Sequence, residues 1–159
     1  MESVNIRSRD QSRLPMQWNG DKNFGFSEHE PWLACNNQCD RQTVEIESTD
    51  KDSVLNFYKT MIQLRNHSEY TQTLIYGDLE DVKTDSTGII VYRRKPVQGK
   101  CACGAGANTD SADKSVYVAV NMTGENVNYA IPENADVLVG NYTDYDGTLR
   151  PYETVVYAV

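Results

Sequence analysis

The pattern of apolar and polar positions divides the chain into three stretches. Residues 1–42 show no sustained period, residues 51–66 place apolar side chains at helical spacing, and from about residue 75 the period becomes two. Helical spacing is typical of a helix with one buried face, and a period of two is typical of half-buried strands. The sequence therefore predicts an α+β structure with a loop, a helix and then a sheet.

The helix over 51–66 gives the strongest signal. Thr49 or Asp50 can cap its start, and Asp52 lies in the first turn, where the helix dipole favours an anion. Arg65 in the last turn complements the other end of the dipole. The apolar stripe comprises Val54, Phe57, Tyr58, Met61, Ile62 and Leu64. Because the stripe is broad, we expect the helix to pack on a large body.

Strands are expected where Val, Ile and Tyr dominate short alternating runs between turn residues. These runs are 74–80, 88–94, 115–121, 127–131, 136–140 and 153–159, with TVEIE at 43–47 as a further short strand. Several short strands with regular turns predict an antiparallel sandwich. The small and polar stretch 97–114 is predicted to be a hairpin insertion without a core of its own.

The charge and length of the chain narrow the choice of partners. Its 159 residues are about the length of one domain. Its 15 basic and 23 acidic residues give a formal net charge of −8, which repels phosphate backbones, so we expect no nucleic-acid partner. No apolar run approaches the ~20 residues that span a bilayer. Membrane association is therefore expected only through segments outside this sequence.

The cysteines and the glycosylation sequons indicate an oxidising compartment. Cys35 and Cys39 can pair across a short polar loop, whereas Cys101 and Cys103 lie too close in sequence for an unstrained bridge. The spacings differ from those of common zinc ligands, so we expect no metal site, and free thiols are the alternative to a bridge. Three sequons begin at Asn66, Asn121 and Asn141. Together these features predict a protein that is secreted or lies at the extracellular surface.

The run SRDQSRLPMQW at residues 8–18 resembles the segment SRDxxRTPMQW of the α-glucosidase, oligo-1,6-glucosidase and maltase branch of the α-amylase family. Further matches follow in the same order: NFGFS at 23–27, Pro31-Trp32, DSVLNFYK at 52–59, Leu64-Arg65, YGD at 76–78 and LRPYE at 149–153. The similarity covers nearly the whole chain apart from 97–114. Two departures are Leu14, where the family has Thr, and Phe24, where many relatives have Ala.

The resemblance implies a (β/α)8 barrel followed by an antiparallel β-sandwich. On that basis residues 1–72 are a remnant of the catalytic barrel, comprising a loop on the active-site face and the last barrel helix. Residues 73–159 are the carboxyl-terminal β-sandwich domain. The chain is thus expected to be an α+β fragment. The loop 1–42 has too little apolar content to fold alone, so we expect it to lie against the rest of the barrel.

The resemblance also implies an activity for the intact protein, which is retaining hydrolysis of terminal α-linked glucose from maltose-type oligosaccharides. The family takes its nucleophile and its acid/base carboxylate from earlier barrel strands, and no acidic residue here lies in those motifs. His29 and His67 are not followed by Asp, as a family histidine would be. We therefore assign no catalytic residue, and we expect this portion to be inactive by itself. No cofactor is expected.

Arg13 is the candidate substrate-binding residue. In the family the matching Arg lines the blind end of the glucose pocket, where it pairs with an upstream Asp and holds hydroxyls of the non-reducing sugar. The fixed fork of a guanidinium suits this role, because it can bind a carboxylate and a hydroxyl together. The structural alternative is an arginine that bridges loops. Gln17 and Trp18 are either sugar contacts or packing anchors, and Arg9 and Asp10 are predicted to form an ion pair.

Two other functions are compatible with the sequence. Ectodomains of amino-acid-transporter heavy chains resemble this family and can lack the catalytic carboxylates, and a stand-alone β-sandwich can bind carbohydrate. A membrane span upstream would identify the first, and maltose binding by the isolated chain would identify the second. The glycosidic linkage is not readable, because the deciding residues lie upstream in the family.

Overall fold

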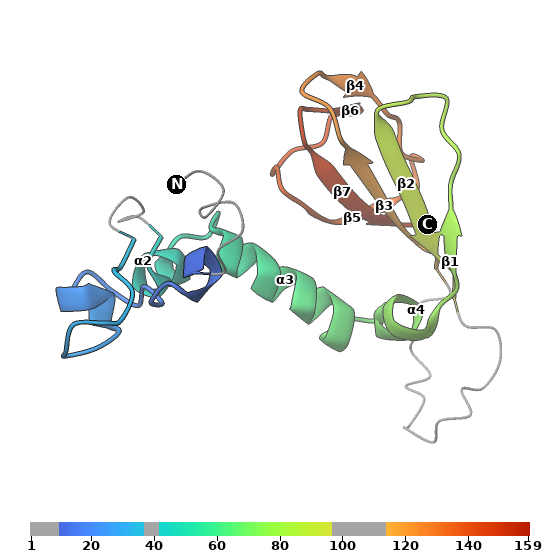
Figure 1. Ribbon diagram of the computed structural model, residues 1–159. Helices are drawn as coiled ribbons and strands as arrows, with labels where there is room; N and C mark the ends of the chain where they lie inside the picture. The colour runs from blue at the N-terminus through green and yellow to red at the C-terminus, as the bar shows by residue number, and fades with distance from the viewer. Residues whose placement is uncertain (1–9, 37–41, 97–113) are drawn as a thin grey trace. The chain divides into compact units, whose positions relative to one another are not determined.

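The computed structural model, shown in Figure 1, describes residues 10–36, 42–96 and 114–159. The chain divides into two compact units, Met1–Lys59 (unit one) and Thr60–Val159 (unit two), and the boundary falls inside one helix. Among the described residues, no helix combines the length and the apolar character needed to cross a membrane. The predicted combination of helices with an antiparallel sheet is confirmed.

The described residues of unit one form two 3-10 helices, a short α-helix and the beginning of a longer one. They are η1 (Asp10–Arg13), η2 (Lys22–Gly25), α2 (Val44–Thr49) and α3 (Val54–His67). The helix predicted over 51–66 is confirmed as α3, which begins after Ser53. The Ser53 hydroxyl accepts a hydrogen bond from the Asn56 N–H at 3.1 Å. This residue therefore caps the helix in place of Thr49 or Asp50.

The strand predicted at 43–47 is wrong, because these residues begin helix α2. The Thr43 hydroxyl accepts a hydrogen bond from the Ile46 N–H at 3.3 Å, which is the arrangement of a helix N-cap. The first two N–H groups of the helix donate to the carbonyl oxygens of Gln17 and Trp18, at 3.0 and 2.9 Å. Distant loop carbonyls thus satisfy donors that a helix start leaves unpaired, and this contact decides between helix and strand.

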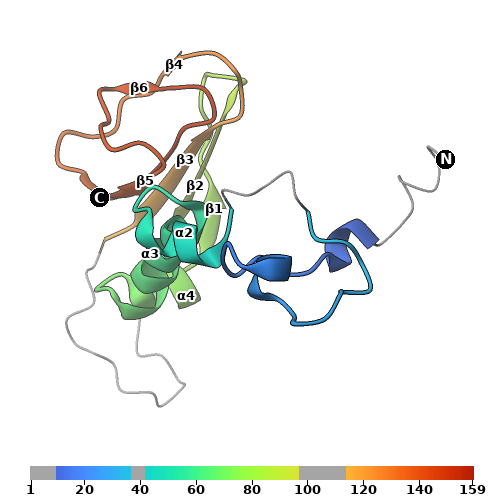
Figure 2. The same cartoon turned by 90° about the vertical axis from the view of Figure 1, so that its left-hand side faces the viewer.

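Unit two contains the short helix α4 (Thr71–Tyr76) and, in its described residues, seven strands in two antiparallel sheets. The larger sheet has the order β1-β2-β3-β7-β5, and the smaller one pairs β4 with β6 (Figures 1 and 2). The strands are β1 (Leu79–Asp81), β2 (Ile89–Arg94), β3 (Val116–Asn121), β4 (Val127–Asn128), β5 (Asp136–Gly140), β6 (Thr148–Leu149) and β7 (Thr154–Ala158). Strands β2, β3, β5 and β7 confirm four predicted strands to within one residue at each end.

The strand predicted at 74–80 is wrong over most of its length, because helix α4 occupies its first part and only β1 follows. Gly77 separates the two elements. A β-carbon on this residue would lie 2.2 Å from the Lys95 carbonyl oxygen and 2.4 Å from that of Thr73, so the backbones pass too closely for a larger residue. The strand predicted at 127–131 is reduced to β4, and its partner β6 has no counterpart among the predicted strands.

Unit two has an apolar core on both faces of its larger sheet. Successive residues of β7 alternate between two buried clusters, with Val155 and Tyr157 in one and Val156 and Ala158 in the other. Leu149 of β6 is fully buried in the first cluster, so the small sheet covers that face. Helices α3 and α4 contribute partly buried residues to the second cluster. Strand β7 is therefore buried on both sides, which explains its uninterrupted apolar run.

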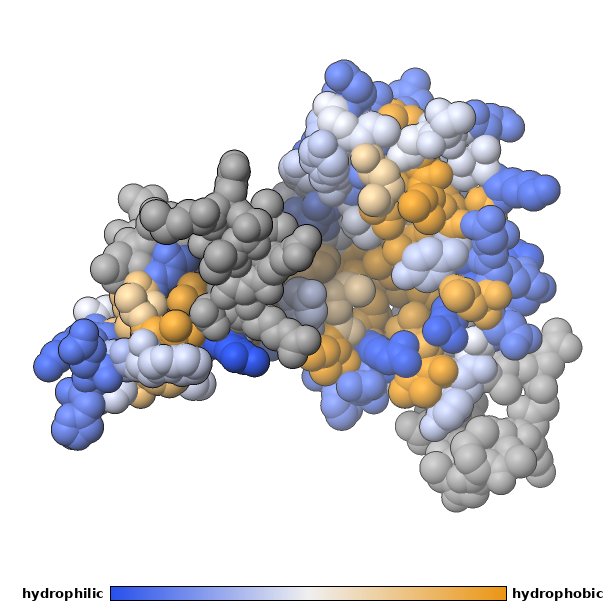
Figure 3. All heavy atoms as spheres, viewed as in Figure 1, coloured by the Kyte–Doolittle hydropathy of each residue, from blue (hydrophilic) through white to orange (hydrophobic). Residues whose placement is uncertain are grey.

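Unit one has no comparable core in its described residues. Its buried side chains are Pro15, Thr43 and Ser53, whereas every side chain of the buried apolar clusters lies at Tyr70 or beyond. Large apolar side chains of unit one are instead exposed: Leu14, Met16, Trp18, Phe26, Trp32, Ile46, Val54 and Tyr58. Figure 3 shows that apolar residues reach the surface of the molecule. On α3 the exposed apolar residues continue to Ile62 at intervals of four, so one face of this helix is uncovered.

Candidate functional site

Arg13 lies at the end of η1, and its side chain is exposed. Within the described part of the chain the Arg13 side chain takes part in no hydrogen bond or ion pair. The next residue, Leu14, is also exposed, whereas Pro15 is buried and fixes the chain directly after it. The N–H donors of this guanidinium are therefore available to a group outside the described residues.

A tight turn gives the loop after Arg13 a fixed shape. The Trp18 N–H donates to the Phe24 carbonyl oxygen at 2.9 Å, which closes the loop onto itself. Asn23, Phe24 and Gly25 have φ values of 54°, 53° and 68°, which form a run of three left-handed residues. Asn and Gly tolerate this conformation, but it is rare for a residue as bulky as Phe. The Asn23 side chain stabilises the turn by donating to the carbonyl oxygens of Ser27 and His29, both at 2.9 Å.

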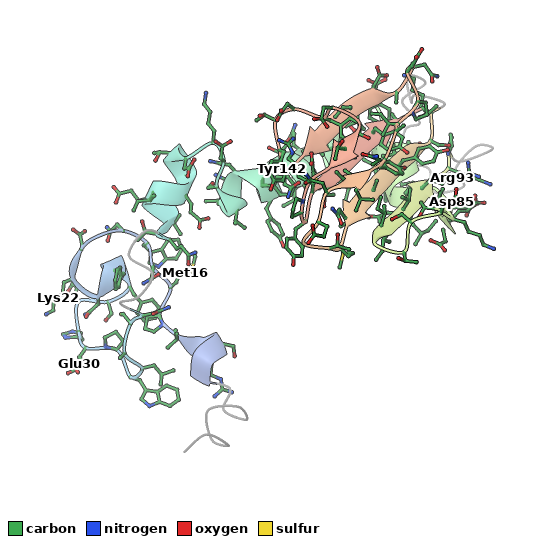
Figure 4. All side chains as sticks on the ribbon, turned by 90° about the horizontal axis from the view of Figure 1, so that it is seen from above. Met16, Lys22, Glu30, Asp85, Arg93 and Tyr142 are labelled. Carbon is green, nitrogen blue, oxygen red and sulfur yellow. The ribbon has the colours of Figure 1, made fainter. Side chains whose placement is uncertain are left out.

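The same loop is attached to the start of α2 through Gln17 and Trp18, whose carbonyl oxygens accept from the first N–H groups of that helix. The Gln17 side chain also donates to the Asn36 carbonyl oxygen at 2.7 Å. The amide of Gln17 thus holds the loop together, while Trp18 leaves half of its side chain exposed. Met16, Lys22 and Glu30 mark this loop in Figure 4.

The cysteine and ion-pair predictions fall mostly outside the described residues. Cys35 is partly buried, and its Sγ lies 3.6 Å from the Asn23 carbonyl oxygen. Cys39, Cys101, Cys103 and Arg9 lie outside the described residues, so the bridge between Cys35 and Cys39 and the ion pair of Arg9 with Asp10 stay predictions. Within the described ranges, no group of three or more His, Cys, Asp or Glu side chains is arranged to hold a metal ion.

The three sequons differ in their surroundings. Asn66 and Asn141 are exposed, and glycosylation of these two residues stays a prediction. Asn121 is 1% exposed, and its amide nitrogen donates to the carbonyl oxygens of Glu125, Leu149 and Arg150 at 2.7, 3.1 and 2.9 Å. A glycan on that nitrogen would have to displace these contacts. Glycosylation at Asn121 also stays a prediction, and these contacts disfavour it in the folded domain.

Unit two holds a polar cluster that the sequence analysis did not identify. Arg150 donates through its Nε to Glu153 at 3.0 Å and through its terminal nitrogens to the Asp144 carboxylate at 3.1 and 3.2 Å. Hydrogen bonding to Glu153 and then to Asp144 raises the pKa of Arg150. The guanidinium also lies over the Tyr142 ring, 4.2 Å from its centroid. The only sequence signal for this cluster is the short run of Arg, Pro, Tyr and Glu that leads into β7.

Comparisons with known proteins show which proteins the chain resembles. Residues 1–77 match the family model for the α-amylase catalytic domain. The α-glucosidase MAL12 of Saccharomyces cerevisiae is 34% identical over 99% of this chain and 26% of its own length. The oligo-1,6-glucosidase of Bacillus cereus is 30% identical over 99% of this chain and 27% of its own length.

Solved structures give the same result. The trehalose-6-phosphate hydrolase of Bacillus licheniformis matches with a TM-score of 0.75 and 28% identity, over 99% of this chain and 27% of that one. The isomaltulose synthase of Klebsiella sp. LX3 matches with a TM-score of 0.74 and 31% identity, over 95% and 26%. The chain is therefore similar to the α-amylase family of glycoside hydrolases over residues 1–77, and to its α-glucosidases and oligo-1,6-glucosidases over nearly its whole length. It spans about a quarter of the length of these curated relatives.

Proposed function

We propose that the chain is the carboxyl-terminal portion of an α-glucosidase, which as an intact protein releases terminal α-linked glucose from maltose-type oligosaccharides with retention. The observation that carries this proposal is the similarity to α-glucosidases over 99% of the chain. Retention requires a nucleophile and an acid/base carboxylate roughly 5–5.5 Å apart. In this proposal both carboxylates come from the rest of the catalytic domain, so the chain by itself is inactive.

The proposed division assigns residues 1–72 to the catalytic barrel and residues 73–159 to a β-sandwich. The exposed apolar side chains of unit one support the first assignment, because a segment without its own core needs a larger body to cover it. The uncovered face of α3 fits a helix that packs on a barrel. The pairing of β4 with β6 over the buried Leu149 supports the sandwich, since it adds a second sheet on one face of the first.

Arg13 binds sugar hydroxyls and an aspartate of the barrel in this proposal. Its exposure and the fixed shape of the loop behind it support that role, because a binding group has to be held in place while its donors stay available. Gln17 positions the loop, and the exposed Trp18 faces either the sugar or the barrel. Secretion of the protein stays a prediction and does not depend on this role of Arg13.

A hybrid enzyme tests the proposal. The chain replaces the matching segment of the yeast α-glucosidase MAL12, so that the catalytic carboxylates come from the relative. We expect the hybrid to hydrolyse maltose, and we expect Arg13→Ala to lower kcat/KM by roughly a hundredfold, because several charge-assisted hydrogen bonds are lost. The control Lys22→Ala removes another exposed cation of the same loop and leaves kcat/KM within about twofold.

Each part of the proposal has an outcome that contradicts it. A folded hybrid without activity would remove the α-glucosidase assignment and favour a non-catalytic relative. Unchanged kcat/KM in Arg13→Ala would show that Arg13 does not contact the sugar. An equal loss of kcat/KM in Lys22→Ala would show that the Arg13 substitution acts through the stability of the loop. Glucose release from maltose by the 159-residue chain alone would contradict the placement of the carboxylates.

A further inference from the structure

Two exposed tyrosines lie on one hydrogen-bonded cluster of unit two. Tyr142 is 43% exposed and Tyr152 is 66% exposed. The Asn141 side chain joins their backbones, because its amide nitrogen donates to the Tyr152 carbonyl oxygen at 3.0 Å and its oxygen accepts from the Thr154 N–H at 2.8 Å. The two exposed tyrosines are therefore joined through their backbones at the start of β7, and Tyr142 is labelled in Figure 4.

The Tyr142 ring is held by Arg150, which covers one of its faces. This guanidinium is itself held by Asp144, and by Glu153, which is only 2% exposed. A cation fixed over one face of an aromatic ring leaves the opposite face available for a second ligand. The ring is thus prearranged, so a ligand that stacks on it does not have to order the side chain first.

Tyr152 is held in a strained conformation. It lies in a turn that is closed by the Glu153 N–H donating to the Arg150 carbonyl oxygen at 3.0 Å, and its φ is 58°. Such a position in a turn favours glycine, and a bulky side chain there is an outlier that the surrounding structure must maintain. A second contact maintains it here, because the Tyr152 N–H donates to the Thr123 carbonyl oxygen at 3.2 Å. Strain that presents an exposed aromatic ring is the observation that points to a ligand.

We infer that Tyr142 and Tyr152 form a surface subsite for a neutral oligosaccharide of α-linked glucose, separate from the pocket assigned to Arg13. Tyrosine combines an apolar face, which stacks on the C–H face of a pyranose, with a hydroxyl that bonds sugar hydroxyls. The neighbouring acids Asp144 and Glu153 and the net charge of −8 disfavour an anionic ligand. The choice of glucose as the sugar rests on the proposed function.

Binding of maltotriose to the full 159-residue chain tests this inference. The chain is made in a bacterial host, which adds no glycan to Asn141, and calorimetry is combined with retardation in a native gel that contains glycogen. We expect saturable binding at millimolar maltotriose and roughly tenfold weaker binding for Tyr142→Ala, the loss typical of an aromatic contact residue. Tyr152→Gly removes the second ring and suits the positive φ, so the same loss is expected in a variant whose fold is preserved. Tyr76→Ala, at an exposed tyrosine elsewhere in unit two, is the matched control and keeps full binding.

The outcomes separate this subsite from the proposed catalytic role. Absence of binding by the unmodified chain, or equal binding by Tyr142→Ala and Tyr152→Gly, would overturn the subsite and leave the hybrid-enzyme test of Arg13 unaffected. Equal weakening in Tyr76→Ala would also overturn it. If maltotriose binding depends on the two tyrosines but the hybrid enzyme is inactive, the surface subsite is supported and the α-glucosidase assignment is contradicted.

Discussion

Unit one and unit two are stabilised by different interactions. Unit two buries apolar side chains on both faces of its sheet, whereas the described part of unit one is held by backbone hydrogen bonds, by Asn and Gln side chains and by two helix caps. A hydrogen bond adds only about 0.5–1.5 kcal/mol of net stability, because it replaces bonds to water. Polar contacts thus define the shape of unit one but do not supply the stability that apolar burial gives to unit two. We therefore expect that unit one needs a larger body and that unit two does not.

Removal of one core side chain should show the difference most strongly. We expect Leu149→Ala to destabilise unit two by about 2–5 kcal/mol, because the fully buried side chain leaves a cavity. The matched change in unit one, Trp32→Ala, removes a side chain that is 83% exposed and should alter stability by no more than about 0.5 kcal/mol. Urea unfolding followed by circular dichroism measures both, and similar losses would contradict the contrast between the units.

Two asparagines of unit two allow a smaller comparison, between buried and exposed polar contacts. Asn121 is buried and bonds three carbonyl oxygens, so we expect Asn121→Ala to cost about 2–3 kcal/mol by leaving them unpaired. Asn141 makes similar backbone contacts at the surface, where water can replace them, so Asn141→Ala should cost less than about 1 kcal/mol. The same urea titration measures both. An equal loss in the free energy of unfolding for both variants would show that burial does not determine how much these hydrogen bonds stabilise the domain.

The smallest expected effect is electrostatic. Hydrogen bonds from Lys95 and then from Arg93 hold the pKa of Glu80 below its ordinary value of 4.5. Because the pKa is lower in the folded state, this contribution to stability is present above about pH 4.5 and is lost as the pH falls through the lowered pKa. We expect the fall in Tm between neutral pH and about pH 3 to be slightly smaller in Glu80→Gln than in the unmodified chain. An identical fall in Tm for Glu80→Gln and the unmodified chain would show that Glu80 does not contribute to the loss of stability in acid.

The elements that could be predicted from sequence are those whose periodic pattern is long or strongly apolar. Helix α3 carries six apolar residues at helical spacing, and β2, β3 and β7 are rich in Val, Ile and Tyr. The errors at 43–47 and 74–80 concern short runs, in which distant contacts decide. Carbonyl oxygens of Gln17 and Trp18 complete the start of α2, and Gly77 passes close to the backbone of Lys95.

The candidate sites also differ in whether a local sequence pattern indicates them. Arg13 could be found because it lies in a long motif, whereas the cluster around Tyr142 depends on Asp144, Arg150 and Glu153 meeting in three dimensions. Burial also separates the three sequons, which look alike in the sequence. A local pattern cannot show that Asn121 lies inside the fold while Asn141 lies at the surface.

Hydrogen exchange of the 159-residue chain in the absence of any other polypeptide tests whether unit one depends on a larger body. We expect amides of β3 and β7 to exchange at least roughly a hundredfold more slowly than those of residues 14–36 and α2, because among the described residues the buried apolar clusters lie in unit two. Equal protection of both regions would contradict the claim that unit one depends on a larger body.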